Sequence, residues 1–140
     1  MADMLQLDLV SPARLLLSES VGMVVVPGVE GYFGVLSNHM PLLSTLRPGV
    51  VSVHDSVEAA PSRSFFVEGG FAEVNPNGCT LLVDDAIPMA ELNRDSINER
   101  RSAAEEKLQS ASTQEDRLAA ESALVVVAAM AEALDKAAQA

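Results

Sequence analysis

Few of the residue types that carry chemistry occur in this chain, and none stands in a pattern typical of a catalytic site. The only lysines are Lys107 and Lys136, and neither follows the glycine-rich turn that a phosphate-binding loop requires. Cys79, His39 and His54 lie apart in the sequence, without the spacing of a metal-binding motif. The sequence therefore predicts no catalytic residues, no metal site and no bound cofactor.

Two polar segments and the single cysteine also have non-catalytic interpretations. Residues 37–39 (Ser-Asn-His) and 84–85 (Asp-Asp) offer acid-base groups, but we interpret the first as a turn and the second as a solvated strand-end cap. Cys79 begins an apolar run, which favours a small core residue over a nucleophile. A single cysteine forms no internal disulfide, so the fold does not depend on an oxidising compartment and the cytoplasm is the default location.

Charge and hydropathy exclude several classes of partner. The net charge is -11, and both halves of the chain are acidic, which argues against nucleic acid or an anionic bilayer surface as the partner. The longest run without a polar residue, 123–131, has nine residues, whereas a membrane-spanning helix needs about 20. We therefore expect a soluble protein with no direct lipid insertion.

Residues 4–85 have the pattern of β-structure. Leu5, Leu7 and Leu9 alternate with other residues, which predicts a strand with one buried face. Turn residues follow one another too closely for crossover helices, so the strands should be antiparallel and form a sandwich or a flattened barrel. Further strands are expected at residues 21–26, 50–54, 64–68, 71–75 and 80–83.

Glycine and proline mark the expected turns. In the segment 26–49, four glycines can adopt positive φ, and strands should start or stop at three prolines. These residues are Gly28, Gly31, Gly34 and Gly49, and Pro27, Pro41 and Pro48. The segment 75–78 (Asn-Pro-Asn-Gly) predicts a hairpin with positive φ at Asn77 and Gly78 in type I′ geometry. Gly69 and Gly70 mark either a bend between adjoining strands or a close approach of another backbone.

After Pro88 the composition changes to Ala, Glu, Arg and Leu, which predicts helices at about 89–110 and 113–138. Ser112 and Glu115 form a capping box for the second helix, and the short break predicts an antiparallel hairpin. Its apolar stripes contain many small residues, so the hairpin should be marginally stable and able to detach. The stripes are Ile97, Ala104, Leu108 and Ala111, and Ala120, Leu124, Val127, Ala131 and Leu134.

Nearly the whole chain resembles the epsilon subunit of bacterial F-type ATP synthases, which is homologous to the mitochondrial delta subunit. The similar blocks, in order, are residues 10–12, 26–28 with 30–31 and 34–36, 39–43, 46–50, 66–74 and 82–86. The resemblance implies a ten-stranded antiparallel β-sandwich (residues 1–87) followed by a two-helix antiparallel hairpin (88–140). It also implies a non-catalytic rotor subunit of the central stalk, peripheral on the cytoplasmic face of the bacterial inner membrane. Such a subunit links gamma to the c-ring and couples proton translocation to ATP synthesis.

The resemblance further implies contact residues. The turn formed by Glu30, Gly31, Tyr32 and Phe33 should face the c-ring; His39, Met40 and Pro41 should face gamma; the hairpin should reach the alpha and beta catalytic subunits. Tyr32 stands where some relatives carry an acid, and our hypothesis is that Glu30 takes its place. In the family's ATP-binding motif the aspartate has become Asn93 and the arginine Ser96, after Leu92, so we infer that ATP sensing is weak or lost.

Three hypotheses follow. The first is the rotor subunit, a weak inhibitor of ATP hydrolysis because its second helix is acidic. The alternative is a nucleotide-sensing regulatory module acting through the hairpin, which tight ATP binding would favour. If the resemblance reports only fold, the chain is a free-standing β-sandwich adaptor, and gamma would not co-purify with it.

Overall fold

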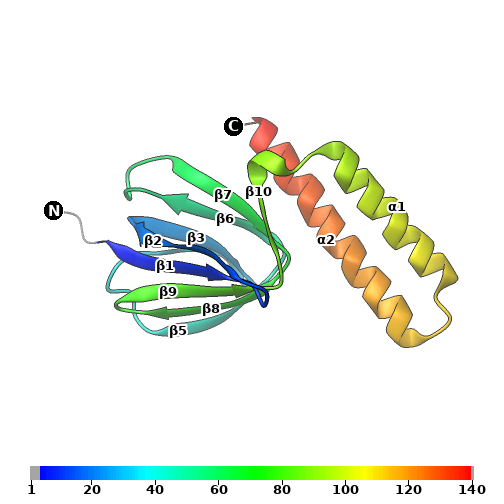
Figure 1. Ribbon diagram of the computed structural model, residues 1–140, viewed down its shortest axis with the longest axis horizontal. Helices are drawn as coiled ribbons and strands as arrows, with labels where there is room; N and C mark the ends of the chain where they lie inside the picture. Colours follow the sequence, from blue (N-terminus) through cyan, green and yellow to red (C-terminus); the bar gives the residue numbers. More distant parts are fainter. Residues whose placement is uncertain (1–3, 140) are drawn as a thin grey trace. The chain divides into compact units, whose positions relative to one another are not determined.

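A computed structural model describes residues 4–139 of the chain. The chain divides into two compact units, Met1–Met89 and Ala90–Ala140, and the ribbon in Figure 1 shows strands in the first and helices in the second. The strands are β1 (Leu5–Val10), β2 (Leu15–Val21), β3 (Met23–Gly28), β4 (Gly31–Val35), β5 (Leu42–Leu46), β6 (Gly49–His54), β7 (Pro61–Val67), β8 (Gly70–Asn75), β9 (Gly78–Val83) and β10 (Ala86–Pro88). A 3₁₀ turn (Met89–Glu91) leads to α1 (Arg94–Ser110) and α2 (Gln114–Gln139).

The strands form one curled sheet in the order β10-β7-β6-β3-β5-β8-β9-β1-β2, with β4 paired to β3. The expected ten-stranded sandwich and helical hairpin are confirmed, but the expectation that all strands pair in antiparallel fashion was wrong at one place. β1 and β9 are parallel, with Leu7 opposite Cys79. A parallel pair needs a long connection, and here the strands β2 to β8 supply it without a crossover helix.

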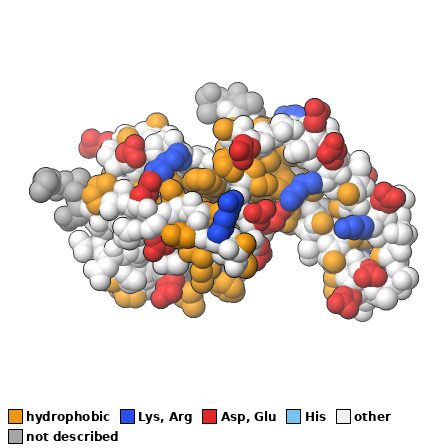
Figure 2. All heavy atoms as spheres, in the orientation of Figure 1, with side chains coloured by type: hydrophobic (Ala, Val, Ile, Leu, Met, Phe, Trp, Pro, Cys, Tyr) orange, Lys and Arg blue, Asp and Glu red, His pale blue; other side chains and the backbone are white. Residues whose placement is uncertain are grey.

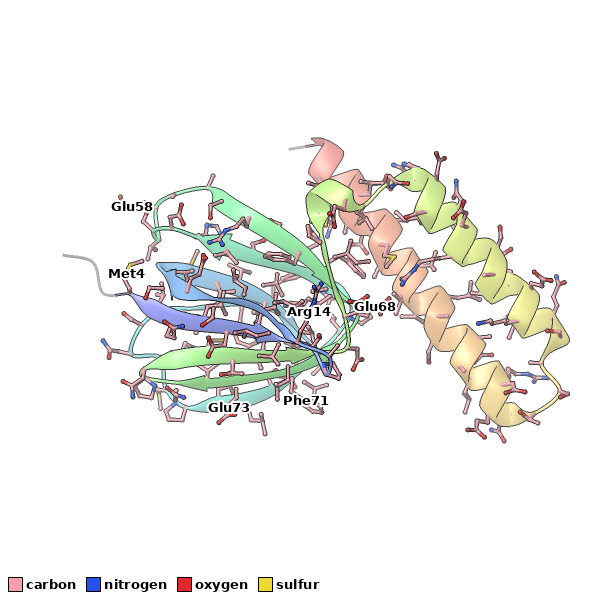
Figure 3. All side chains as sticks on the ribbon, viewed as in Figure 1. Met4, Arg14, Glu58, Glu68, Phe71 and Glu73 are labelled. Atoms are coloured by element: carbon pink, nitrogen blue, oxygen red, sulfur yellow. The ribbon has the colours of Figure 1, made fainter. Side chains whose placement is uncertain are left out.

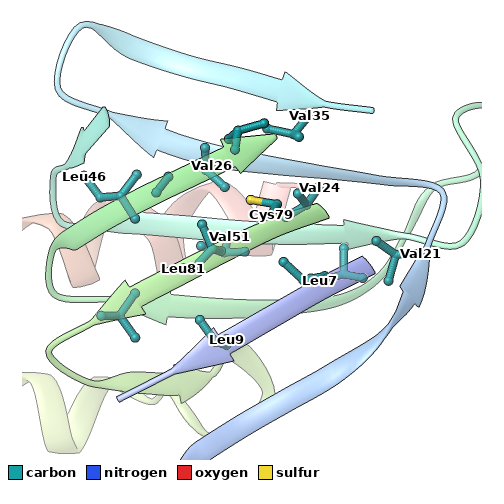
Figure 4. Close-up of a cluster of buried hydrophobic side chains, with 14 of the residues drawn as sticks. Leu7, Leu9, Val21, Val24, Val26, Val35, Leu46, Val51, Cys79 and Leu81 are labelled. Carbon is teal, nitrogen blue, oxygen red and sulfur yellow. The ribbon is translucent and has the colours of Figure 1, made fainter. Parts of the chain in front are cut away.

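The core lies between the two layers of the curled sheet (Figure 4). Leu5, Leu7 and Leu9 are buried as their alternation predicted, and Cys79 is buried among them as a small core residue. No polar or charged side chain within residues 4–137 is buried. Since each fully buried aliphatic side chain contributes about 1.5–3 kcal/mol relative to exposure, this core dominates the stability of the β-unit. Its other members include Val21, Val24, Val26, Val35, Leu46, Val51, Val53, Val67, Ala72, Val74, Leu81 and Val83.

One predicted strand, residues 21–26, is in fact two. Val21 ends β2, and Met23 begins β3. Between them, the Gly22 N–H donates to the His54 carbonyl at 2.9 Å, and a Cβ on Gly22 would lie 2.5 Å from the Cα of Ser56. The chain therefore bends sharply at Gly22, where only glycine fits. The apolar run that was predicted as one strand contains the end of β2 and most of β3, which lie in different parts of the sheet.

The prediction for Pro27 was also wrong, because this residue lies inside β3 and does not end it. β3 pairs with β6 up to Val25 and with β5 at Gly28, so proline stands where the strand changes partners. At that point its missing N–H costs no ladder hydrogen bond. The expectation for the other two prolines was correct, since β5 begins directly after Pro41 and β6 directly after Pro48.

The hairpin between β8 and β9 is confirmed, but its predicted type I′ geometry is wrong. Positive φ occurs, within residues 4–139, at Asn38, Gly31, Gly69 and Gly70. The loop is Pro76-Asn77, with Asn75 opposite Gly78. Asn75 Oδ1 accepts hydrogen bonds from the N–H groups of Asn77 and Gly78, both at 2.9 Å. Proline in the first loop position fixes a negative φ, and the Asn75 side chain closes the turn instead.

Both interpretations of the glycine pair hold at once. Gly69 and Gly70 have φ of 132° and 142° and form the bend between β7 and β8. A Cβ on Gly70 would lie 2.0 Å from the Leu82 carbonyl oxygen. The backbone that approaches is therefore the chain's own neighbouring strand, β9.

Of the predicted stripe residues in the hairpin, Ile97, Ala104, Ala120 and Val127 are buried and the other five are half-buried. Met130 and Ala133, which the predicted stripes left out, are also buried. Both helix starts differ from prediction. Asn93 Oδ1 caps α1 through the Ser96 N–H at 2.9 Å, so this helix begins five residues after the expected start. Thr113 Oγ1 caps α2 through the Asp116 N–H at 3.0 Å, so the predicted Ser112–Glu115 capping box is wrong by one residue. Among the described residues no helix is long and apolar enough to cross a membrane.

Candidate partner-contact surface

The β3–β4 turn places Glu30 at the end of a hairpin. Gly31 follows with φ 137°, and a Cβ there would meet nothing within 4 Å. Glu30 is exposed, whereas Phe33 packs against the core cluster. Together with β5 these residues border a depression of about 340 Å³, lined by Gly28, Val29, Glu30, Gly31, Phe33, Leu42, Leu43, Ser44 and Thr45. Of the four predicted c-ring contacts, Glu30 therefore presents a charge and Phe33 anchors the turn.

Tyr32 is held by the segment that joins β5 to β6. Its hydroxyl accepts a hydrogen bond from the Val50 N–H at 3.0 Å, and the Arg47 guanidinium carbon lies 5.3 Å from the ring centroid. Gly49 makes room for this contact, because a Cβ there would lie 2.7 Å from the tyrosine oxygen. The cation–π contact and the hydrogen bond fix the position of the ring, so Tyr32 connects the β3–β4 turn to the start of β6.

The predicted gamma contacts lie on the loop between β4 and β5, residues 36–41. Asn38 adopts φ 61°, consistent with its interpretation as a turn residue, and its N–H donates to the Pro76 carbonyl at 3.0 Å. His39 Nδ1 bonds the Met40 carbonyl at 2.7 Å. Met40 itself is 79% exposed. The loop is thus fixed to the β8–β9 turn and presents an unbranched apolar side chain to solvent.

Next to this loop, three strands carry large apolar side chains on the side away from the core. Leu43 of β5, Phe71 of β8 and Leu82 of β9 are 71%, 51% and 47% exposed. Phe71 stands opposite Leu82 in the ladder, so their side chains are neighbours on one face. Figure 3 shows Phe71 and Glu73 on the outer side of the sheet, and Figure 2 shows hydrophobic atoms gathered along it. We call Met40, Leu43, Phe71 and Leu82 the outer apolar face.

Sequence reasoning missed the outer apolar face, although the signal was present. Successive side chains of β5, β8 and β9 point to opposite faces of the sheet, so every second residue faces the core. Apolar residues at the positions between them predict that the outer face is also covered. Beside Phe71 and Leu82 the face continues into a depression of about 410 Å³, which reaches the end of β1. Its lining is Val10, Ser11, Pro12, Gly70, Phe71, Leu82, Val83 and Asp84.

Structural roles are visible for the three residues that the resemblance places in a degraded ATP-binding motif. Leu92 is buried. Asn93 and Ser96 are joined as the cap of α1, so the side chain of Asn93 already satisfies an N–H group of the helix N-terminus. An anion at this helix start would compete with that cap.

Comparison with known proteins decides the family. The family model described as ATP synthase, Delta/Epsilon chain, beta-sandwich domain matches residues 4–89. An ATP synthase epsilon chain of Paramagnetospirillum magneticum (strain ATCC 700264 / AMB-1) is 47% identical over 134 residues, covering 96% of this chain and 99% of that protein. The chain belongs to the ATP synthase epsilon chain family. An epsilon chain of Rhodospirillum rubrum is 43% identical over 130 residues, covering 93% and 96%.

Solved structures agree with this membership. The chain resembles, with a TM-score of 0.77 and 26% identity, a chain of the Euglena gracilis mitochondrial ATP synthase in an OSCP/F1/c-ring structure, covering 94% of this chain and 81% of that one. A chain of the Tetrahymena thermophila mitochondrial ATP synthase central stalk and c-ring matches with a TM-score of 0.69 and 18% identity, covering 93% and 96%, and so shows the fold. The chain is therefore a non-catalytic subunit of an ATP synthase.

Proposed function

We propose that the chain is a rotor subunit of the central stalk, which links gamma to the c-ring and couples proton translocation to ATP synthesis. The observation that supports this most is the outer apolar face on a β-unit with a fully apolar core. A stiff, closely packed body transmits torque without unfolding, and a group of large exposed apolar side chains on one face of such a body indicates a protein interface. The proposed site is the cytoplasmic side of the bacterial inner membrane, reached through partner subunits.

Gamma is the proposed partner of the outer apolar face and of the loop with His39, Met40 and Pro41. Exposed apolar side chains next to a loop fixed by the Pro76 carbonyl form the core of a contact, with polar residues at its rim. The test is co-purification of gamma with the tagged full chain. Leu43→Asp should abolish most of the recovery of gamma, whereas Val57→Asp, at an exposed position in the β6–β7 loop, should leave it unchanged. Full recovery with Leu43→Asp would contradict the proposal.

The c-ring is the proposed partner of the β3–β4 turn, with Glu30 supplying the charge. In membrane vesicles with the complete enzyme, Glu30→Lys should lower ATP-driven proton pumping relative to ATP hydrolysis. Glu58→Lys makes the same charge change in the loop after β6, at the opposite end of β3 from Glu30, and should leave the ratio unchanged. Unaltered pumping with Glu30→Lys would refute the role of Glu30.

Inhibition of ATP hydrolysis through α2 is proposed to be weak. The helix carries Glu115, Asp116, Glu121, Glu132 and Asp135 against Arg117 and Lys136, and like charge opposes docking among catalytic subunits with acidic surfaces. Deleting residues 88–140 should change hydrolysis by the assembled enzyme little. A several-fold rise would contradict this.

ATP binding to the hairpin unit is proposed to be weak or absent, since Asn93 and Ser96 form the α1 cap. Calorimetric titration of the full chain with ATP tests this proposal. Saturable, tight binding would favour the nucleotide-sensing alternative.

A further inference from the structure

The pair Asn77-Gly78 carries intrinsic chemistry that the rotor function does not use. In such a pair the backbone nitrogen of glycine attacks the carboxamide carbon of the preceding asparagine. A C–N bond forms, the bond to Nδ2 breaks, and ammonia leaves, producing a five-membered succinimide. Water then opens the ring at either carbonyl and leaves aspartate or isoaspartate. The reaction requires no catalyst and no change of oxidation state, and glycine offers no Cβ to hinder the attack.

The position of the pair makes it accessible to this reaction. Asn77 is exposed in the two-residue loop between β8 and β9. Water therefore reaches both the carboxamide and any succinimide formed from it. Gly78, the first residue of β9, supplies the attacking nitrogen.

The same turn contains a restraint on the reaction. The Gly78 N–H donates to Asn75 Oδ1 at 2.9 Å, and the Asn77 N–H donates to the same oxygen at 2.9 Å. Attack requires the Gly78 nitrogen to lose its proton and to move toward the Asn77 carboxamide. The hydrogen bond from the Gly78 N–H opposes both steps, and the one from the Asn77 N–H holds the backbone of Asn77 in the turn. We propose that Asn77 is a site of spontaneous conversion to aspartate and isoaspartate, and that Asn75 restrains the conversion by holding the attacking nitrogen.

Conversion to isoaspartate would disturb more than one side chain, because it adds a main-chain atom directly before Gly78. Gly78 pairs with Gln6 in the parallel β1–β9 ladder, and even a Cβ there would lie 2.8 Å from the Gln6 carbonyl oxygen. On the other side of the turn, the Pro76 carbonyl accepts the hydrogen bond from the Asn38 N–H. The modification therefore loosens the loop 36–41 that carries Met40.

The test follows Asn77 by peptide mapping and mass spectrometry while the purified full chain is kept at mildly alkaline pH. Asn75→Leu removes the acceptor, and Asn75→Asp keeps an oxygen in its place. Loss of the two hydrogen bonds should make conversion at Asn77 roughly tenfold faster in Asn75→Leu than in the wild type, and Asn75→Asp should stay within about twofold of the wild type. Equal rates in Asn75→Leu and the wild type, or equal rates in both variants, would overturn the restraint.

A second measurement does not depend on those variants. The wild-type chain unfolded in urea gives the rate without the turn, and the folded chain should react at least roughly tenfold more slowly. If the folded chain reacts as fast as the unfolded one, Asn75 does not protect the site. If the unfolded chain does not react, the site itself is refuted.

The effect on the loop is measured separately by amide hydrogen exchange. After ageing, residues 36–41 should exchange faster in the wild type but not in Asn77→Gln, where the longer side chain disfavours ring formation. Equal exchange would overturn the coupling between the turn and the loop. Neither the conversion nor its effect on exchange depends on the proposed rotor function, so a failure of gamma co-purification leaves both to be judged independently.

Discussion

The two units of the chain differ in the side chains that they bury. The β-unit encloses one contiguous core made mainly of valine and leucine, with Leu5, Leu7 and Leu81 fully buried, and the pairing of β1 with β9 joins strands that are far apart in the sequence. The helices of the hairpin bury fewer side chains, three of them alanine (Ala104, Ala120 and Ala133) beside Ile97, Val127 and Met130, and the two helices follow one another directly in the sequence. The contrast indicates that one contiguous core makes the β-unit rigid, whereas alanine at the helix contacts allows close approach of the helices but buries little apolar area.

The largest expected effect concerns the core of the β-unit. Leu81→Ala should lower the free energy of unfolding by about 3 kcal/mol, because it leaves a cavity among residues that do not collapse into it. Leu82→Ala, one residue away on the exposed side of β9, should cost less than about 1 kcal/mol. Urea unfolding of both variants provides the comparison. Equal losses would mean that β9 does not separate a core face from a surface face.

The second effect is a pH dependence confined to the β-unit. Burial raises the pKa of the Cys79 thiol to about 12 from its usual 9.0, because the thiolate would lose its hydration. The unfolded chain therefore releases this proton first, and stability falls above pH 9, by about 1.4 kcal/mol per pH unit until the folded pKa is reached. Urea unfolding over this range should show a smaller slope in Cys79→Ala, which lacks the buried thiol. An unchanged slope would contradict burial of the thiol.

A third effect sharpens the description of the hairpin. Thr113→Ala removes the acceptor that caps α2 and should destabilise the helix by about 1 kcal/mol. Ser112→Ala, the residue that the sequence pattern indicated, should have almost no effect. Hydrogen exchange of the first turn of α2 distinguishes the two. The reverse order would restore the capping box at Ser112.

The smallest effect concerns the ion pair between Arg94 and Asp135, which joins the start of α1 to the end of α2. Both side chains are largely exposed, so Arg94→Ala should cost at most about 0.5 kcal/mol, and less in high salt. Amide exchange at the two helix ends measures it. A cost above that of Thr113→Ala would mean that charge, and not packing, holds the hairpin closed.

The sequence predicted what depends on local patterns. Alternation identified the buried face of β1, glycine and proline located most turns, and the composition change after Pro88 located the helices. Prediction failed where contacts with residues elsewhere in the chain determine the local conformation. The break at Gly22 depends on Ser56, the place of Pro27 inside β3 depends on two partner strands, and the loop geometry at Asn77 depends on a side-chain acceptor.

The candidate site divides in the same way. Resemblance to the family's sequence blocks indicated residues 30–33 and 39–41, but the roles within them follow from geometry: Tyr32 is braced by Arg47 and Val50. The outer apolar face was not predicted, since Leu43 and Phe71 come to lie on one face of the sheet only through the pairing of β5 with β8. Residue types alone do not say which side of a strand is outermost.

The parallel pairing of β1 with β9 has a consequence for how the chain folds. β2 follows β1 directly in the sequence and can pair with it as soon as both are synthesised. The other edge of β1 pairs with β9, residues 78–83, so the sandwich closes only after almost the entire β-unit has been synthesised. Long-range closure is slow because its loop entropy is lost before its contacts form. The helical hairpin is made of local contacts and should fold faster. During synthesis, one edge of β1 is unpaired and open to association with other chains until β9 has been synthesised.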